Sequence, residues 1–357
     1  MNTHLAQAPT ATQDSAPPSR AAQPEARPVL QVEDLQITFD LRERRLHAVN
    51  GVSFEVRRGE LLGIVGESGS GKSVTLLSLL RLLPSPPARL AGGSVRFDGT
   101  ELTTLGDDAL RRLRGGRIGY VFQDPMTSLN PVFTVGYQLV EPLRIHRGMS
   151  KRAARARAAD LLRMVGIPSP ESRLDAYPHQ FSGGMRQRVM IAIALACEPE
   201  LLIADEPTTA LDVTIQAQIL ELVRDLRGRL GAGVVWITHD LGVVAGIADR
   251  VMVMYAGQVV EEAPVDALFE TPRHPYTQAL LATLPDHGSA RRSRLASISG
   301  QPPVMNAPPS ACPFAPRCTH VMDRCLSANP PLARVGEAHS AACWRAYPAE
   351  TAHGATP

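Results

Sequence analysis

Residues 66–73, GESGSGKS, constrain the fold of this chain more than any other segment. They follow a short apolar run, LLGIVG, and precede a helix-forming segment, SVTLLSLLRLL, that is expected to stop at Pro84. The pattern GxxxxGKS lets a glycine-rich backbone turn its N–H groups toward phosphate oxygens, beside the positive end of a helix. In this pattern the lysine reaches the β- and γ-phosphates and the serine hydroxyl binds Mg²⁺. We therefore predict that ATP and Mg²⁺ bind through Gly66, Glu67, Ser68, Gly69, Ser70, Gly71, Lys72 and Ser73.

Apolar runs and amphipathic segments alternate along most of the chain. Half-buried strands are expected over LQVEDLQITF and VNGVSFEV, and buried strands over IGYVF, LLIAD, VVWITH and VMVMY. Helices are expected between the later strands, and residues 124–188 are expected to be mainly helical, with Ser150 capping a helix that Gly166 ends. This alternation predicts a parallel α/β sheet with a helical insert.

The two ends of the chain differ from this pattern. Residues 1–28 are rich in Ala, Pro, Gln, Thr and Ser and predict a disordered tail, and residues 347–357 predict a second tail. From residue 271 to residue 346 the chain is richer in Pro and Cys, which suggests a separate C-terminal unit. The domain between them is expected to span residues 29–270, with its helical part at about residues 124–188.

The composition excludes several classes of protein. The formal net charge is +2, so no strong attraction to nucleic acid is expected. The longest apolar run covers residues 189–197, whereas a helix that spans the hydrocarbon needs about 20 residues. The first residues lack the basic start and apolar centre of a secretory signal. We therefore expect a peripheral role at most at a membrane, and a reducing cytoplasm in which the five cysteines form no structural disulfides.

Two carboxylates close one of the apolar strands. The segment LLIADE ends in Asp205 and Glu206, which places both side chains at the carboxyl edge of a parallel sheet, where α/β proteins bind ligands. Because a phosphate-binding loop lies upstream, we predict that Asp205 holds Mg²⁺ and that Glu206 polarises the attacking water as a general base. The alternative is an acidic strand end in contact with solvent alone.

Gln123 and His239 also follow apolar strands, IGYVF and VVWIT. At the same sheet edge, each side chain would face the γ-phosphate. A lone polar residue at a strand end is more often structural or solvated. The order of both residues relative to the phosphate loop and the carboxylates favours a role in one site.

Residues 181–188, FSGGMRQR, precede the apolar segment VMIAIALA. A hydroxyl followed by two glycines at a helix start makes a second anion-binding position. The same pattern also serves as an ordinary helix entry. Its place between the phosphate loop and the carboxylate strand favours the functional interpretation.

Taken in order, these motifs resemble the ATP-binding subunit of ABC transporters over roughly residues 29–270. The set is GESGSGKS, Gln123, FSGGMRQR, LLIADE, the ALD of residues 210–212, and His239. The resemblance implies a P-loop NTPase (RecA-like) core with an antiparallel β subdomain, a helical signature subdomain and a small C-terminal extension. It implies catalytic roles for Glu206, His239 and Gln123, and Mg²⁺ ligands at Ser73, Gln123 and Asp205. Phe39 is the nearest candidate for the residue that stacks on adenine, and a core or strand-edge role for Phe39 stays open.

The resemblance also implies a composite ATP site. Members of this family dimerise head to tail, so that ATP lies between the P-loop of one subunit and the signature of the other. The residues expected to face the partner's ATP are Ser182, Gly183, Gly184 and Gln187 of the signature and Asp212 of the D-loop. ATPase activity should therefore be weak in the isolated chain at low concentration and should rise on assembly.

Three further segments resemble the oligopeptide/dipeptide import ATPases: FQDPMTSLNP, YPHQFSGGMRQR and HPYTQALLATLP. By this resemblance the chain energises peptide import from the cytoplasmic face of the inner (plasma) membrane. Its partners would be two transmembrane permease subunits, a second ABC ATPase of different sequence and an extracytoplasmic peptide-binding protein. Residues 124–131 would receive a short permease helix, unless they form a simple loop. Nickel, glutathione and other small solutes stay open as cargo, and a soluble ABC ATPase without a transport role is the remote alternative.

Four cysteines lie close together near the end of the chain, with the spacing C-x5-C-x6-C-x17-C: Cys312, Cys318, Cys325 and Cys343. This spacing lacks the paired CxxC of common zinc modules. Four thiolates suit an iron–sulfur cluster or tetrahedral zinc, and free structural cysteines are the other possibility. Because CPFAPRC resembles a segment that holds a [4Fe–4S] cluster in some dipeptide-type ATPase subunits, we favour that cluster over zinc. Cys197 is predicted to be a core residue.

Overall fold

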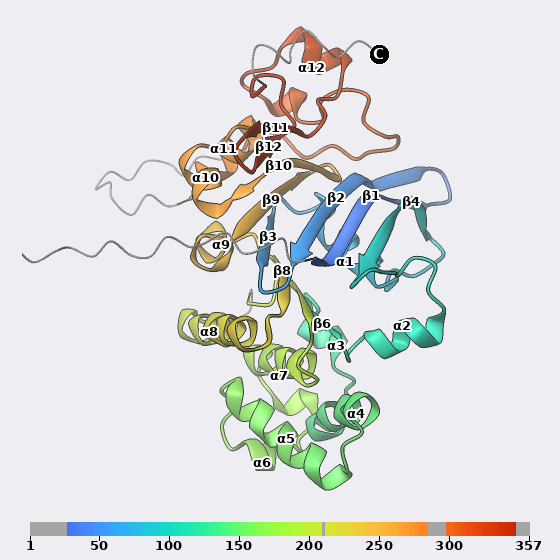
Figure 1. The fold of residues 1–357 in the computed structure, drawn as a ribbon, viewed down its shortest axis with the longest axis vertical. Coiled ribbons are helices and arrows are strands. Elements are labelled where there is room, and N and C mark those ends of the chain that lie inside the picture. The colour runs from blue at the N-terminus through green and yellow to red at the C-terminus, as the bar shows by residue number, and fades with distance from the viewer. Residues whose placement is uncertain (1–26, 209–210, 285–297, 348–357) are drawn as a thin grey trace, which may run out of the picture.

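The computed structural model describes residues 27–208, 211–284 and 298–347. Two sheets form the body of the molecule (Figure 1). The smaller sheet is antiparallel, with the strand order β2-β1-β4-β5. It contains β1 (Pro28–Asp40), β2 (Arg45–Arg57), β4 (Ala88–Phe97) and β5 (Thr100–Glu101). The larger sheet has eight strands in the order β11-β12-β10-β9-β3-β8-β7-β6.

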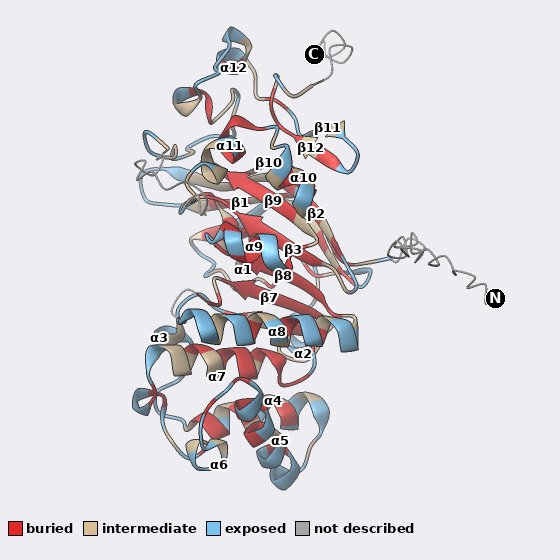
Figure 2. Ribbon diagram, turned by 90° about the vertical axis from the view of Figure 1, so that its left-hand side faces the viewer, coloured by how far each residue is buried: buried red, intermediate tan, exposed pale blue. Residues whose placement is uncertain are grey.

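The centre of the larger sheet is parallel and is buried on both faces (Figure 2), as the continuous apolar runs predicted. Its strands are β3 (Leu61–Val65), β6 (Ile118–Val121), β7 (Leu201–Asp205), β8 (Gly233–Ile237) and β9 (Arg250–Tyr255). Successive side chains of a strand point to opposite faces. Leu61 and Val65 of β3 therefore join one apolar cluster, and Leu62 and Ile64 join the other.

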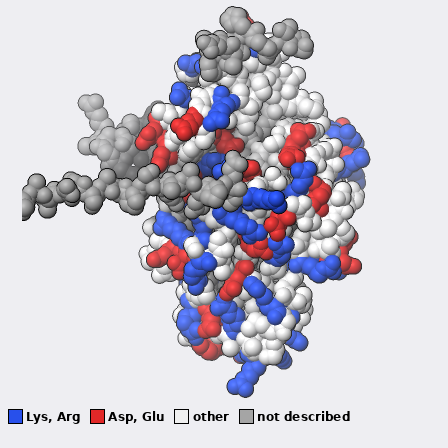
Figure 3. Space-filling view, viewed as in Figure 1, with Lys and Arg blue, Asp and Glu red and all other residues white. Residues whose placement is uncertain are grey.

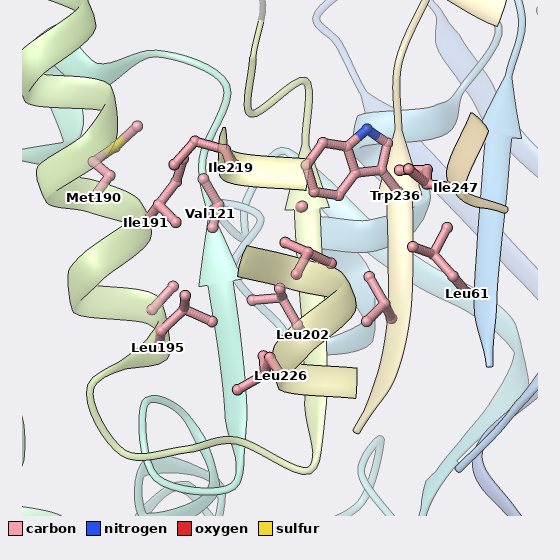
Figure 4. Close-up of a cluster of buried hydrophobic side chains, with 14 of the residues drawn as sticks. Leu61, Val121, Met190, Ile191, Leu195, Leu202, Ile219, Leu226, Trp236 and Ile247 are labelled. Carbon is pink, nitrogen blue, oxygen red and sulfur yellow. The ribbon is translucent and has the colours of Figure 1, made fainter. Parts of the chain in front are cut away.

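Helices cover one face of this sheet, and the antiparallel sheet covers the other. The first face meets α7 (Gly183–Leu195), α8 (Val213–Leu230) and α9 (Leu241–Ile247). Figure 4 shows Leu202 and Trp236 of the strands among helix residues such as Ile191 and Leu226. On the second face, α1 (Lys72–Leu79) packs with β1 and β2. The parallel strands thus form the rigid layer from which the polar loops project.

The expectation that the helix after the P-loop continues to Pro84 is wrong. Helix α1 ends at Leu79, and Arg81 adopts a left-handed conformation with φ 49°. The Leu82 N–H donates to the Leu77 carbonyl at 2.9 Å, and the Arg81 N–H donates to the Ser78 carbonyl at 3.0 Å. These are the two bonds of a Schellman turn, which ends a helix without a proline.

A helical region lies at the lower end of the molecule in Figure 1. It contains α3 (Pro125–Ser128), α4 (Val135–Arg147), α5 (Lys151–Met164), α6 (Pro170–Arg173) and the 3₁₀ turn η1 (Pro178–Gln180), followed by α7. The predicted cap of α5 is confirmed, since the Ser150 hydroxyl accepts from the Ala153 N–H at 3.3 Å. Gly166, with φ 70°, follows directly after this helix, as predicted. A further helix, α2 (Asp107–Leu113), precedes β6.

The C-terminal extension lies at the opposite end and continues the core sheet. Helix α10 (Val265–Glu270) leads into it. Its own elements are α11 (Pro275–Leu281), η2 (Ala315–Arg317), α12 (Asp323–Ser327), β11 (Ala333–Gly336) and β12 (His339–Ala341). Strand β12 pairs with β10 (Gln258–Pro264), so the extension is not the separate unit that the composition suggested. Buried Glu261 of β10 reinforces the joint by accepting from His339 Nε2 at 2.7 Å and from the His274 N–H at 2.9 Å.

Charged side chains of both signs are interspersed on the face shown in Figure 3. Salt bridges also connect elements that are distant in sequence. Arg58 and Arg117 both pair with Asp98, beside β5, and with Glu200, just before β7. These pairs link the antiparallel sheet to the parallel one. Within the described residues, no helix combines the length and the apolar character needed to cross a bilayer.

Candidate functional site: an ATP-binding P-loop at the sheet edge

The P-loop leaves the end of β3 and turns directly into α1. Its first and third glycines, Gly66 and Gly71, have φ values of 150° and 99°, a region that side chains rarely adopt. A Cβ atom on Gly66 would lie 2.3 Å from the Met254 carbonyl oxygen, and one on Gly71 would lie 2.7 Å from the Ala48 carbonyl oxygen. Both positions therefore require glycine, for conformation and for space.

Lys72 points back into the loop that precedes it. Its Nζ donates to the carbonyls of Gly66 at 2.7 Å and Glu67 at 2.9 Å. Burial lowers the pKa of Lys72, and the nearby Glu206 and Asp205 carboxylates oppose that shift. The ammonium group is thus held where the loop encloses an anion.

Ser73 and Asp205, two of the predicted Mg²⁺ ligands, lie side by side. The Ser73 hydroxyl donates to Asp205 Oδ1 at 3.0 Å. Burial raises the pKa of Asp205, while the Ser73 hydrogen bond lowers it and the neighbouring Glu206 raises it. A hydroxyl and a carboxylate are the hard oxygen donors that Mg²⁺ prefers, so this pair fits the ion.

Glu206 and His239 also meet at this edge. His239 Nδ1 lies 3.3 Å from Glu206 Oε2, with the histidine side chain 62% exposed and the glutamate side chain 16% exposed. Glu206 has a left-handed backbone, φ 48°, and its N–H donates to the Ile237 carbonyl at 3.0 Å. This backbone turn directs the Glu206 carboxylate away from the line of the strand, and the carboxylate lies beside the exposed His239 imidazole.

Gln123 is placed near these residues but is not bonded to them among the described contacts. It lies two residues beyond β6, whose last residue, Val121, pairs with Ala204 of β7. Its side chain is exposed. The strand pairing puts Gln123 at the same sheet edge as Asp205, as the sequence predicted.

A pocket of about 620 Å³ opens beside the P-loop. Phe39 lines it and also packs against the apolar cluster around the antiparallel sheet, so its surroundings suit either a stacking role or a strand-edge role. The pocket walls come from β1 and β2, from the P-loop, and from residues 301–305 of the C-terminal extension. The His47 N–H donates to the Met305 carbonyl at 2.7 Å and holds that extension segment in place. A pocket of about 620 Å³ has the size of a small-molecule site.

The signature residues begin α7 in the helical region. Ser182 is the N-cap, and its hydroxyl accepts from the Met185 N–H at 3.3 Å. Ser182 and Gly183 are exposed and Gly184 is half-buried. Gln187, by contrast, is 1% exposed, and its Nε2 has no hydrogen-bond partner among the described residues. The exposed helix start is therefore the part of this motif that can meet another molecule.

Asp212 is a second exposed helix cap. Its side chain accepts from the Ile215 N–H at 3.0 Å at the start of α8. The preceding Ala210 of the ALD motif lies outside the described residues. The structure thus gives Asp212 a local role in capping the start of α8.

The four clustered cysteines line one small cavity together with His274, Phe314 and Trp344. None of them forms a disulfide. Burial raises the pKa of the Cys312 thiol to about 11, and N–H donors from Phe314 and Ala315 oppose that rise. Within the described residues, no group of three or more His, Cys, Asp and Glu side chains is arranged to hold a metal ion. Cys197 is 1% exposed, as predicted for a core residue.

Two residues of the extension touch the P-loop, and no role was predicted for either of them. Tyr276 Oη accepts from the Glu67 N–H at 2.8 Å, and Arg317 pairs with the Glu67 carboxylate at 2.6 Å. Both lie in motifs noted above, HPYTQ and CPFAPRC. The sequence signal that could have identified Arg317 is a lone arginine in a segment otherwise rich in cysteine and proline.

Comparison with known proteins decides the family. A family model described as "ABC transporter" matches residues 49–209, and one described as "Oligopeptide/dipeptide transporter, C-terminal region" matches residues 260–325. The chain is 54% identical over 322 residues to "Probable peptide ABC transporter ATP-binding protein y4tR" of Sinorhizobium fredii, covering 90% of this chain and 96% of that protein. The chain belongs to the ABC transporter ATP-binding proteins.

Other relatives of this ABC ATPase support the same family assignment. It is 51% identical to the oligopeptide transport ATP-binding protein OppD of Bacillus subtilis, with 90% of this chain and 89% of that protein covered. Among solved structures, the dimeric ATP-binding cassette MJ0796, in a post-hydrolysis state bound to ADP and Pi, superposes with a TM-score of 0.61 at 33% identity. That match covers 66% of this chain and 98% of the cassette. The predicted P-loop NTPase fold and the predicted ATPase activity are both confirmed.

Proposed function

We propose that this ABC ATPase energises the import of di- and oligopeptides across the inner (plasma) membrane, as a peripheral subunit on its cytoplasmic face. The observation that carries the proposal is the match of residues 260–325 to the oligopeptide/dipeptide transporter C-terminal region. Relatives that share this region are named for peptide, oligopeptide and dipeptide transport. Nickel, glutathione or another small solute is the alternative cargo.

The test of cargo is uptake by a strain that lacks this chain. Labelled di- and oligopeptides should enter the wild-type strain and the strain complemented with the intact chain, but not the strain complemented with Glu206→Gln. Glu221→Gln, on the exposed side of α8, is the matched control and should restore uptake. Normal peptide uptake in the deletion strain, with loss of nickel or glutathione uptake, would select the alternative cargo instead.

The geometry supports a division of roles within the ATP site. The P-loop would bind the phosphates, and Ser73 and Asp205, joined at 3.0 Å, would hold Mg²⁺ with Gln123. Bound Mg²⁺ neutralises phosphate charge. Glu206 would take the proton of the attacking water, and His239, 3.3 Å from Glu206, would orient that carboxylate and face the γ-phosphate.

A second ABC ATPase chain would complete this site. The exposed N-terminus of α7 would offer Ser182 and Gly183 to a phosphate bound by the partner chain. The P-loop of this chain leads into α1, which packs on β1, β2 and β7, whereas α7 packs on α3, α4, α5 and β6. An exposed helix start with free N–H groups favours an anion. By resemblance the partner has a different sequence, and an extracytoplasmic binding protein would deliver the peptide to two permease subunits.

The exposed apolar side chains around α3 support contact with a permease. Met126 is 62% exposed and Val132 is 70% exposed, and the exposed rings of Phe133 and Tyr137 stack on each other with their centroids 4.6 Å apart. Apolar side chains gathered in this way mark an interaction surface. Met126→Asp should therefore abolish peptide uptake in cells while ATP affinity of the purified chain stays unchanged. Retained uptake would exclude this surface.

We also propose that the four cysteines bind a [4Fe–4S] cluster. The four thiols share one cavity. Burial raises the pKa of Cys312, Cys318 and Cys343, and backbone N–H donors at each sulfur oppose that rise in favour of the thiolate that a cluster binds. The chain purified without oxygen should be brown and contain iron and sulfide, and Cys318→Ser should remove both. Stoichiometric zinc in a colourless protein, or no metal at all, would reject the cluster.

A further inference from the structure

Glu67 brings a negative charge to the start of the P-loop, and all of its polar groups are engaged. Arg317 donates to its carboxylate twice, from Nη1 to Oε2 at 2.6 Å and from Nη2 to Oε1 at 2.9 Å. The Glu67 N–H donates to Tyr276 Oη at 2.8 Å, and its carbonyl accepts from Lys72 Nζ at 2.9 Å. Two of these three partners, Tyr276 and Arg317, belong to the C-terminal extension.

Arg317 is itself held rigidly. Its side chain is only 4% exposed. The guanidinium donates to the Ser299 carbonyl at 2.8 Å, to the Ile298 carbonyl at 3.2 Å and to Tyr255 Oη at 3.3 Å. A guanidinium fixed by several acceptors presents a fork that matches a carboxylate in two places, which a lysine does not reproduce.

The charge of Glu67 matters because the loop encloses a polyphosphate. A carboxylate near the phosphates would oppose their binding, and the effect is larger in a partly buried site than in water. The same extension also lines the neighbouring pocket through residues 301–305. We propose that Arg317 is a positioning residue of the ATP site, through which the C-terminal extension offsets the charge of Glu67 and fixes the first residues of the P-loop. This role concerns the nucleotide and is independent of the cargo.

The experiment measures ATP affinity of the purified full chain with Mg²⁺ by titration calorimetry. Arg317→Ala should weaken ATP binding roughly tenfold to a hundredfold, as expected for loss of a hydrogen-bonded charge pair. Arg317→Lys should give an intermediate loss, because it keeps the charge without the fork. Adding Glu67→Gln to Arg317→Ala should restore affinity to within a few-fold of wild type, since the unpaired carboxylate is then gone.

Arg334→Ala is the matched control, because it removes one positive charge from the β11–β12 hairpin of the same extension. Its ATP affinity should equal that of wild type. The proposal is overturned if Arg317→Ala binds ATP as wild type does. It is equally overturned if Glu67→Gln fails to rescue Arg317→Ala, whether or not thermal unfolding shows that the extension has melted.

Discussion

Two regions of this ABC ATPase carry motifs for the same ligand: the P-loop side, made of residues 66–73 with Asp205, and the signature side, at the start of α7. The residues of the P-loop side are hydrogen-bonded to one another within this chain. On the P-loop side, Lys72, Ser73 and Asp205 are already bonded to their surroundings, and Arg317 reaches the loop from the far end of the chain. On the signature side, the exposed Ser182 hydroxyl accepts from the Met185 N–H of its own helix start, and no other bond of this hydroxyl is found among the described residues. An exposed helix start of this kind can offer its N–H groups to an anion held by another chain.

This difference separates nucleotide binding from turnover. Binding needs only the P-loop side, whose parts lie within one chain. Turnover on the proposed composite site also needs a signature from a second chain, so it should depend on protein concentration and on the partner. Substitutions on the two sides should therefore affect different measurements.

Glu206→Gln should have the largest effect and should leave binding intact. The amide cannot accept the proton of the attacking water, and loss of a general base lowers rates by roughly 10²–10⁴. Turnover of the assembled ATPase should fall accordingly, while ATP affinity stays close to wild type. Phosphate release and calorimetric titration on the same sample distinguish the two. Near-normal phosphate release would show that Glu206 is not the base.

Acid should loosen the P-loop side through His274, which caps the helix that carries Tyr276. His274 Nδ1 accepts from the Tyr276 N–H at 3.0 Å, and burial lowers the pKa of His274 from 6.5 to about 4. Below pH 6.5 the unfolded chain takes up a proton that the folded chain refuses, so stability is lost as the pH falls from about 6.5 to about 4. The total loss from this group is about 3 kcal/mol.

His274→Asn keeps a side-chain oxygen for the cap and removes the titration. Its free energy of unfolding, measured with denaturant, should fall less than that of wild type between pH 7 and pH 5. The comparison concerns the slope with pH, because the smaller side chain also lowers stability at every pH. An identical slope in both proteins would assign the acid sensitivity to other groups.

Ser182→Ala should break the signature side alone. Loss of a hydroxyl that bonds a phosphate should lower turnover of the assembled ATPase roughly tenfold, with ATP affinity of the single chain unchanged. Ser150→Ala is a close control, because Ser150 is also a helix N-cap with an acceptor distance of 3.3 Å. Both substitutions should cost about 1 kcal/mol of stability, but only Ser182→Ala should slow turnover. Equal turnover in the two variants would remove Ser182 from the site.

The motifs and their strands could be predicted because each rests on a local pattern. The strand LLIAD has the predicted bounds, and α5 has the predicted cap, since burial of both sheet faces and a serine before a helix are visible within a few residues. The end of α1 was missed, because a Schellman turn at a non-glycine residue, Arg81, leaves no sequence signal. The Arg317–Glu67 pair spans 250 residues and forms where the C-terminal extension folds back on the core sheet. Such contacts follow from topology, which periodicity does not encode.

Phe39→Ala should have the smallest effect and would sharpen the boundary of the P-loop side. Phe39 lines the pocket beside Gly69 and Gly71, so a base stacked on its ring would connect the adenine to the assembled half of the site. Loss of one stacking contact is worth about 1 kcal/mol, or roughly a fivefold weaker ATP affinity. Val95→Ala, at a buried residue of the adjacent strand β4 outside the pocket, controls for a general loss of apolar packing. If both substitutions weaken ATP binding equally, Phe39 contributes to packing of the sheet. If only Phe39→Ala weakens ATP binding, Phe39 contacts the nucleotide, and the P-loop side of the site extends to the end of β1.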